Sequence, residues 1–492
     1  MIKATKEFLE SIDSLTQKRI NEILNAKDCI KIEGTVYYVS NSGDDDNDGK
    51  SPDTPWQSLD KVNDAELKPG DGVFFKRGDL FRGAIWAKAG VTYAAYGEGP
   101  KPKLYSGSKD FAQKDLWELF DKEHNIWKLK EETRDMGAIV FNDGEEHTRK
   151  MIPSFKNYKF VCRDNPDVEF DMRKEMTQDL DLYWLYKGPI IEEGGVPVIP
   201  YEAESLGELY LRCDRGNPGE VFRSAEALLR LHAIRTCGHG VTVDNFCIKY
   251  VGAHGVSGGG QVNDLTITNC EFGWIGGAIQ NFNRYAANPE RKGVIVRYGN
   301  AIEIYGGCSN YIAHNNYIYE VYDAGITHQV SSTKKLMHEN IEYSDNVIER
   351  CVYGIEYFLG QSGEEKGKIK DTVIKNNIIR FSGYGWGRQR YNPDTPAAVK
   401  SWNSTNLSEN FVFKDNIFDR STAHFMHICA LTNEDCPVMD GNTYIQNLNG
   451  PLGKFGAVVP EAPKRLTYDM DAEKNINTVF GDKNAKVYYI EE

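Results

Sequence analysis

The chain has 492 residues, a formal net charge of −14 and 40% apolar residues, among them 27 Tyr, 22 Phe and 8 Trp. This is more material than one ordinary core needs, so the length predicts two or three domains or one elongated repeat body. The acidic balance argues against nucleic acid as a partner, and no run approaches the roughly 18 apolar residues of a membrane span. We therefore expect a folded, soluble protein that binds neither nucleic acid nor membrane.

The first residues, Met1 to Glu10, carry charges where a secretory signal has its apolar segment, which predicts a cytoplasmic location. Apolar residues recur at helical spacing from about Thr5 to Ala26, so we expect an amphipathic helix that caps the fold, in a first unit of residues 1–34. The ten cysteines form no CxxC pair, which indicates reduced thiols. The sequence thus points to no cofactor and no metal.

Short β-type runs punctuated by Gly, Pro, Asn and Asp begin at Thr35, and we assign residues 35–109 to the first coils of a β fold. An acidic run from Asp44 to Gly49 matches the opening of a calcium loop, but Pro55 stands where the closing Glu belongs, so we expect a solvated turn, with a bound structural cation as the alternative. From residue 110 to 222 the later periodicity is missing, which predicts an inserted β-rich, sandwich-like domain.

An internal repeat organises residues 223–452, and residues 453–492 follow it as a C-terminal cap. Four segments open with an asparagine followed by apolar residues, at Asn316, Asn346, Asn377 and Asn416, and weaker copies begin at Phe246 and Cys270. A second short apolar step follows in each coil, at His254–Val256, Ala301–Ile302, Ala324–Ile326, Tyr353–Ile355, Ala398–Val399 and Phe425–Met426. Stacked coils of this kind predict a parallel β-solenoid with an asparagine ladder. A β-sandwich with Asn-rich turns is the alternative, but it would not keep both steps through four coils.

Three stretches near the start of the β region match a known pattern. They read YYVSNSGD from Tyr37, SPDTPW from Ser51 and LKPGDGV from Leu67. They resemble the N-terminal signature of right-handed parallel β-helix repeat proteins of the pectate-lyase-like superfamily. The layout also resembles β-helix glycoside hydrolases such as the β-xylosidase and α-fucosidase families, over about residues 35–452. The resemblance implies a right-handed parallel β-helix that acts on carbohydrate. The acidic catalytic residues of the β-xylosidase pattern do not coincide with acids in this sequence. The resemblance therefore implies neither the reaction nor the sugar on which the protein acts.

The residue after each inward apolar residue of the second step faces outward, because successive residues of a strand point to opposite faces. One outward column is therefore Ser257, Glu303, Thr327, Glu356, Lys400 and His427, and the next is Tyr305, Gln329, Phe358 and Trp402. Carboxylates supply acid and base while aromatic rings cover the apolar faces of pyranoses, so the pairing suits a sugar site. Outward positions are also polar simply because they meet water, and Glu356 with Lys400 could be a mere cross-strand ion pair.

Glu303 and Glu356 are the predicted catalytic pair, with Asp323, in the turn before the middle strand, as a substitute for either. Strand spacing places the two glutamates roughly 9–10 Å apart at the backbone, which favours inversion through a bound water. Lys400 should lower the pKa of Glu356, making it the base and Glu303 the acid. We expect substrate contacts from His254, Tyr305, Thr327, His328, Gln329, Phe358, Arg388, Arg390, Lys400, Trp402 and His427, although an inward histidine such as His328 is more often a satisfied core residue.

Two inserted loops attach to the same coils, Gly277 to Tyr298 and Gly387 to Pro396. They contain Asn281, Arg284, Tyr285, Arg291, Arg388, Arg390 and Tyr391 and should wall a groove between about Val256 and His427. The expected function is an exo-acting glycoside hydrolase on oligosaccharides. A polysaccharide lyase or epimerase acting on uronic acids, with Lys400 or Arg388 as base, and a non-catalytic carbohydrate-binding β-helix are the alternatives. The sugar, its linkage and the oligomeric state stay open.

Overall fold

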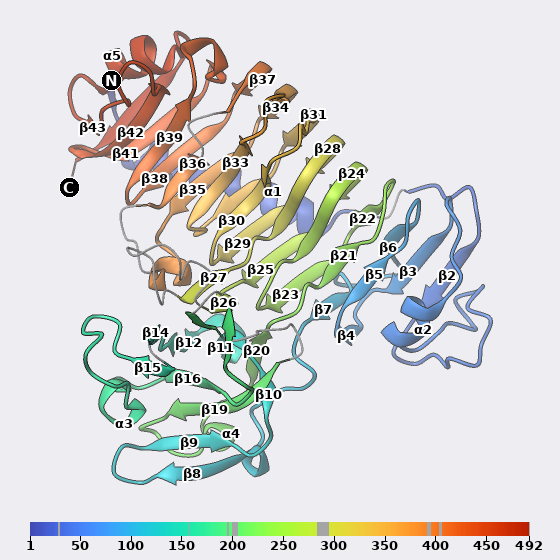
Figure 1. Ribbon diagram of the computed structural model, residues 1–492. Coiled ribbons are helices and arrows are strands. Elements are labelled where there is room, and N and C mark those ends of the chain that lie inside the picture. Colours follow the sequence, from blue (N-terminus) through green and yellow to red (C-terminus); the bar gives the residue numbers. More distant parts are fainter. Residues whose placement is uncertain are drawn as a thin grey trace.

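The computed structural model describes residues 1–27, 30–156, 158–193, 196–198, 205–282, 295–390, 395–402 and 406–491. Within them the chain forms a long stack of coils that follow one another in chain order, from β2 to β44 (Figure 1). Most neighbouring strands of the stack pair in parallel, as in Val256 with Ile302 and Ile302 with Ile326. The predicted all-β, parallel β-helix architecture is therefore confirmed for the main body of the chain.

Two sheets run along the stack. The larger has 18 strands, namely β2 (Val36–Val39), β3 (Gly72–Lys76), β5 (Ile85–Ala87), β6 (Thr92–Tyr96), β21 (Ile234–Thr236), β22 (Thr242–Asp244), β24 (Val256–Thr268), β28 (Ile302–His314), β30 (Ala324–Ser332), β31 (His338–Ser344), β33 (Tyr353–Gln361), β34 (Ile369–Lys375), β36 (Ala397–Ser401), β37 (Ser408–Lys414), β39 (His424–Ala430), β40 (Val438–Asp440), β42 (Gly450–Ala457) and β43 (Leu466–Tyr468). The other has 14 strands, namely β1 (Ile2–Lys3), β4 (Leu80–Arg82), β7 (Lys103–Tyr105), β11 (Met136–Phe141), β12 (Glu146–His147), β20 (Ala225–Leu229), β23 (Cys247–Val251), β25 (Glu271–Ile275), β29 (Tyr317–Val321), β32 (Val347–Glu349), β35 (Ile378–Ser382), β38 (Ile417–Ser421), β41 (Thr443–Asn447) and β44 (Lys486–Ile490).

Inward apolar residues fix the register of the coils. The second apolar step of each coil pairs as expected, in the order Val256, Ile302, Ile326, Ile355, Val399 and Met426, and each of these side chains is fully buried. Because side chains alternate between the two faces of a strand, a slip by one residue would turn this apolar row outward. The core therefore determines which residues face out at every coil.

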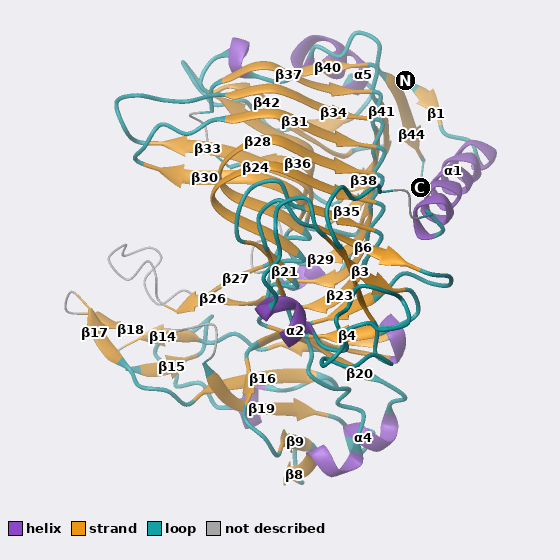
Figure 2. Ribbon diagram, turned by 90° about the vertical axis from the view of Figure 1, so that its right-hand side faces the viewer, coloured by secondary structure: helices purple, strands orange, loops and turns teal. Residues whose placement is uncertain are grey.

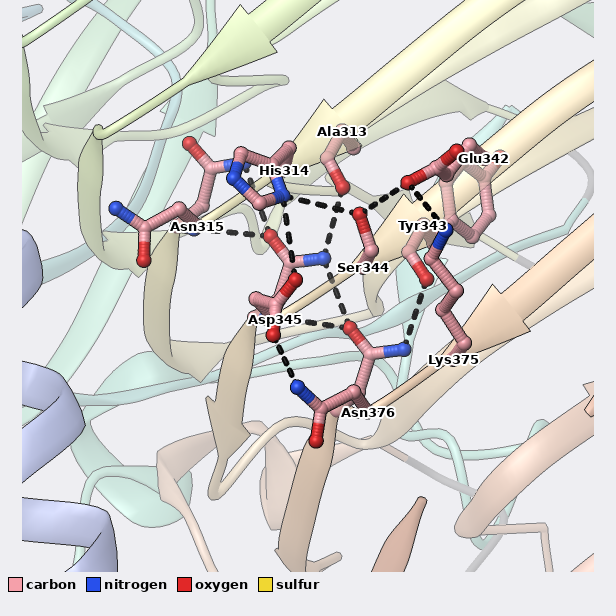
Figure 3. Close-up of polar contacts among 12 residues, drawn as sticks. Ala313, His314, Asn315, Glu342, Tyr343, Ser344, Asp345, Lys375 and Asn376 are labelled. Carbon is pink, nitrogen blue, oxygen red and sulfur yellow. Dashed lines mark hydrogen bonds and ion pairs between the residues drawn. The ribbon is translucent and has the colours of Figure 1, made fainter. Parts of the chain in front are cut away.

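An asparagine ladder holds one turn of the coils together. The side-chain amide of Asn316 donates to Asn346 Oδ1 (3.0 Å), Asn346 to Asn377 (2.9 Å) and Asn377 to Asn416 (2.9 Å). The same amides also bind main-chain carbonyls, since Asn346 Nδ2 donates to Ala313 O (2.9 Å). Figure 3 shows the turn beside the ladder, with Ala313, Asn315, Asp345 and Asn376. The predicted ladder is confirmed, and it continues through Asn442 to Asp482, which the repeat pattern did not include.

The helix expected near the N-terminus is present as α1 (Lys6–Leu24), and Thr5 caps it by accepting a hydrogen bond from Phe8 N. Its Ile20 and Ile23 pack against Val347 and Ile378, so the helix lies along the side of the middle coils (Figure 2). Before it, β1 pairs in parallel with β44. The predicted role of this segment as a cap stays a prediction.

The segment between the first coils and the main stack contains a six-stranded, largely antiparallel sheet of β8 (Trp117–Asp121), β9 (Ile126–Leu129), β10 (Thr133–Arg134), β13 (Arg149–Lys150), β16 (Asp181–Tyr186) and β19 (Leu206–Arg212). Two strand pairs of this segment stand apart, β14 (Ser154–Lys156) with β15 (Lys159–Val161) and β17 (Ile191–Glu193) with β18 (Val196–Val198). A further separate pair, β26 (Ala278–Phe282) with β27 (Ile295–Tyr298), belongs to the inserted stretch Gly277 to Tyr298 of the main stack. In the segment between the first coils and the main stack, β11 instead pairs with β20 of the coil sheet. The predicted domain boundaries stay predictions, and β11 joins the segment closely to the stack.

The remaining helices are short: α2 (Leu59–Asp64), α3 (Met172–Glu175), α4 (Pro218–Val221), α5 (Ala472–Asn475), the π-helical η5 (Ile476–Phe480) and the 3₁₀ turns η1 (Lys114–Leu116), η2 (Asn142–Gly144), η3 (Trp386–Gln389) and η4 (Asn433–Asp435). Among the described residues, none of the helices combines the length and the apolar character that crossing a membrane would need.

Candidate active site

The first outward column lies as the alternation predicts. Ser257 pairs with Glu303, Glu303 with Thr327, Thr327 with Glu356, Glu356 with Lys400, and Lys400 with His427, one residue for each coil. Although these residues point away from the core, Glu303 and Glu356 are only 6% and 3% exposed. Residues from the turns and loops beside the strands surround them, so the carboxylates are partly removed from water.

Glu303 is held ionised by three hydrogen-bond donors. His254 Nε2 lies 2.5 Å from Oε2, Asn300 Nδ2 donates to the same oxygen (3.1 Å), and Gln329 Nε2 donates to Oε1 (3.3 Å). The backbone N–H of Asn300 donates to His254 Nδ1 (2.9 Å), which leaves the ring proton on Nε2 facing Glu303. Burial works against ionisation of Glu303, but these partners outweigh it and the pKa lies below its usual value.

Glu356, two coils away, is held protonated. Burial, together with the nearby Asp323 carboxylate, raises its pKa to about 8, against the opposing charge of Arg390. The indole N–H of Trp402 donates to its Oε1. Between the two glutamates lies Thr327, whose fully buried hydroxyl has no hydrogen-bond partner among the described residues. The column therefore places a protonated and an ionised carboxyl on either side of an unpaired hydroxyl.

Asp323 forms the third member of this carboxylate cluster, which consists of Glu303, Asp323 and Glu356. It lies in the turn before β30, and Arg390 Nη1, from the loop after η3, donates to its Oδ1. Burial raises the pKa of Asp323, and the Arg390 charge opposes that shift. Arg390 also lies over the ring of Tyr353, 5.4 Å from its centroid. The Asp323 charge acts on Glu356, and the Glu303 charge acts on Asp323, so the three carboxyls are electrostatically coupled; the expected role of Asp323 as a substitute for either glutamate stays a prediction.

The predicted role of Lys400 is wrong in its physical premise. Lys400 Nζ lies 2.7 Å from His427 Nδ1 and 4.3 Å from the Trp402 ring centroid, and within the described part of the chain it forms no ion pair with Glu356. Burial lowers the pKa of Lys400 to about 8 and that of His427 to about 3, the latter helped by the charge of Lys400. The pKa of Glu356 is raised and that of Glu303 is lowered, opposite to the shift expected from Lys400, and the catalytic roles of the two glutamates stay a prediction.

Of the other predicted contact residues, some lie in the second outward column beside the carboxylates, and Arg388 lies away from it. Tyr305, Gln329 and Phe358 form the second column in register, and the Tyr305 and Trp402 side chains are 42% and 45% exposed. Arg388 is exposed and lines a separate hollow with Trp274 and Tyr384.

His328 lies inside the coil, fully buried, with Nδ1 2.8 Å from the Tyr343 hydroxyl. Its ring therefore lies on the opposite side of the strand from the carboxylates, and no geometry supports a substrate contact.

Part of the predicted groove falls outside the described residues, namely Arg284, Tyr285, Arg291 and Tyr391. Asn281 is described, on β26. In the described ranges no three His, Cys, Asp or Glu side chains gather as a metal site. The acidic turn near the N-terminus uses its oxygens internally, since Asp45 accepts from Gln57 and Ser58 while Asp48 accepts from Lys50 and Thr54.

Comparison with known proteins gives a partial match. No protein-family model matches the chain. A segment is 42% identical over 163 residues to lacto-N-biosidase of Bifidobacterium longum subsp. longum, which covers 30% of this chain and 9% of that protein. The match therefore spans a small part of the length of its relative.

Among solved structures, a GH136 lacto-N-biosidase from Eubacterium ramulus aligns over 98% of this chain and 71% of its own, with 13% identity and a TM-score of 0.39. The complex of XylC with xylose aligns over 93% of this chain and 83% of its own, with 14% identity and a TM-score of 0.38.

Sequence reasoning missed Asn300 and His232. Asn300 follows an inserted loop and precedes the strand step, so no periodicity marks it, yet its side chain binds Glu303 and its N–H orients His254. His232 stacks on His254 with 5.0 Å between ring centroids, and burial lowers its pKa to about 2. One sequence signal could have indicated His232: it stands two residues before the inward Ile234, as His254 stands two residues before the inward Val256.

Proposed function

We propose that the protein is a glycoside hydrolase acting on oligosaccharides, with Glu356 as proton donor and Glu303 as the ionised partner. The proposal rests on two buried carboxyls in one column whose surroundings shift their pKa values in opposite directions, with the unpaired Thr327 hydroxyl between them. Environments that push two carboxyl pKa values apart are how one site performs both acid and base chemistry near neutral pH.

In this mechanism the Glu356 carboxyl gives its proton to the leaving glycosidic oxygen, and Glu303 takes a proton from the attacking water. Two strand steps separate the backbones by roughly 9–10 Å, which leaves room for that water and favours inversion. Thr327 would donate to or accept from a sugar hydroxyl. Asp323, paired with Arg390, is the second candidate for either role.

Two further observations support this function. The relative that shares 42% identity over part of the chain is named lacto-N-biosidase, a glycosidase by name. The exposed rings of Tyr305 and Trp402 flank the carboxylate column and offer apolar faces to a pyranose. Exo-action is part of the proposal, because the segment that carries Arg390 stands beside Asp323 and would close the site on one side.

The test is a panel of aryl glycosides, an aryl lacto-N-bioside included, with Glu303→Gln, Glu356→Gln and Asp323→Asn compared with the wild type. Loss of an acid or base typically lowers the rate by about 10²–10⁴-fold. Glu339→Gln is the matched control, because Glu339 lies on β31 opposite Ser309, outside the column.

A dinitrophenyl leaving group needs little protonation, so it should restore the rate of Glu356→Gln but not of Glu303→Gln. Full activity of both variants would refute the assignment. An ultraviolet-absorbing unsaturated product would identify a lyase instead, and binding without any product a carbohydrate-binding protein.

A further inference from the structure

The outward column changes its electrostatic character after Glu356. The next three coils contribute Lys400, His427 and Lys454, which pair in that order across β36, β39 and β42. We call these three residues the cationic end of the column. Because neighbouring parallel strands lie about 4.8 Å apart, it extends over roughly 5–14 Å from Glu356 at the backbone.

The charge of the cationic end is not neutralised by the described protein. Lys400 is 2% exposed, and its Nζ binds neutral His427 in place of a carboxylate. Neither Lys400 nor Lys454 forms an ion pair within the described ranges, and the nearest carboxyl in register, Glu356, holds a proton. Burial keeps the His427 ring unprotonated, and the charges of Lys400, Lys454 and Arg465 act in the same direction.

A buried ammonium without a counter-charge is unfavourable, so such a site is typical of a place that a ligand anion completes. Here the anion would meet the ammonium groups of Lys400 and Lys454. His427 accepts from Lys400 at Nδ1, so its ring proton is on Nε2, which supplies a third donor. Lys400 Nζ lies over the half-exposed Trp402 ring, 4.3 Å from its centroid, and the indole N–H at the edge of that ring donates to Glu356, so one aromatic side chain adjoins both the cation and the acid.

We propose that the cationic end binds the carboxylate or sulfate group of an acidic sugar unit, so that the oligosaccharide substrate carries its negative charge on the Lys400 side of Glu356. The identification of the ligand as part of a substrate rests on the proposed hydrolase function. Carboxylates and cations occupy different coils, so an acidic sugar avoids repulsion by Glu303 and Asp323 while remaining next to the proton donor.

The experiment is a binding titration without turnover, following the His427 ring signals by NMR at constant ionic strength. The probes are D-glucuronate, D-glucose 6-sulfate and neutral D-glucose. The variants are Lys454→Gln, Lys454→Arg and the control Lys464→Gln, which removes an equal charge from an exposed neighbour of Arg465. We expect at least one anionic sugar to bind about tenfold more tightly than glucose, consistent with one added charge-assisted contact.

That preference should disappear in Lys454→Gln and persist in Lys454→Arg and Lys464→Gln. Which of the two anionic sugars binds then identifies the acidic group. Equal binding of glucose and both anions would overturn the proposal, and so would equal loss in the Lys454→Gln and Lys464→Gln proteins, which would indicate bulk charge alone. Because no hydrolysis is measured, failure here is distinguishable from failure of the hydrolase function.

Discussion

The free energy of unfolding of Glu356→Gln, relative to that of the wild type, should increase as the pH rises. Burial raises the pKa of this carboxyl from 4.5 to about 8. Between these values the folded state holds a proton that the unfolded chain has lost, so wild-type stability decreases with rising pH. At about 1.4 kcal/mol per pKa unit, the decrease between pH 5 and pH 7 amounts to about 2.5 kcal/mol. Glutamine does not titrate, and the variant escapes this loss.

Urea unfolding at both pH values measures the effect on the wild type, Glu356→Gln and the control Glu339→Gln. The stability of Glu356→Gln relative to the wild type should increase by about 2.5 kcal/mol from pH 5 to pH 7, while Glu339→Gln follows the wild type. A gap that is the same at both pH values would mean that Glu356 is ionised in the fold. The proton-donor role would then be untenable.

Three other substitutions test the surroundings of the site. His254→Asn removes a hydrogen-bond donor from ionised Glu303 and should raise the pKa of Glu303. The acidic limb of the kcat/KM profile should therefore move to higher pH, while the basic limb, set by Glu356, stays near pH 8. An unmoved acidic limb would contradict the contact between His254 and Glu303. Arg390→Met leaves Asp323 buried without its cation and should reduce the unfolding free energy by about 3–5 kcal/mol, whereas exposed Arg388→Met should change it by less than about 0.5 kcal/mol. Asn377→Ala removes four side-chain hydrogen bonds of the ladder and should reduce stability by about 2–5 kcal/mol, with KM unchanged in assays below the unfolding temperature.

The sequence predicted the outward column to the residue because two short-range rules agree there. Inward apolar residues recur once for each coil, and side chains alternate along a strand, so locating Ile302 and Ile355 also locates Glu303 and Glu356. The asparagine ladder could be found for the same reason. Neither rule needs knowledge of which segments outside the coils fold back onto them.

The protonation states of Glu303 and Glu356 could not be predicted from these two rules. Glu356 adjoins Lys400 in register, which suggested an ion pair, but the pKa of a carboxyl depends on burial, and residues from distant segments produce that burial. Arg390 reaches Asp323 across 67 residues of chain, and Asn300 follows an inserted loop with no repeat signal. Lys400 has Glu356 on one neighbouring strand and His427 on the other, and its Nζ binds His427.

The pairing of β1 with β44 affects how the stack can open. In a protein of stacked coils each coil contacts its neighbours, so the terminal coils usually fray first and independently. Here fraying of the last coil must also release β1, and α1 follows directly after that strand with Ile20 and Ile23 packed against the middle coils. Opening one end is thus linked to undocking a helix near the centre. Opening of the C-terminal strand is therefore coupled to contacts in the middle of the solenoid and is not an independent local event.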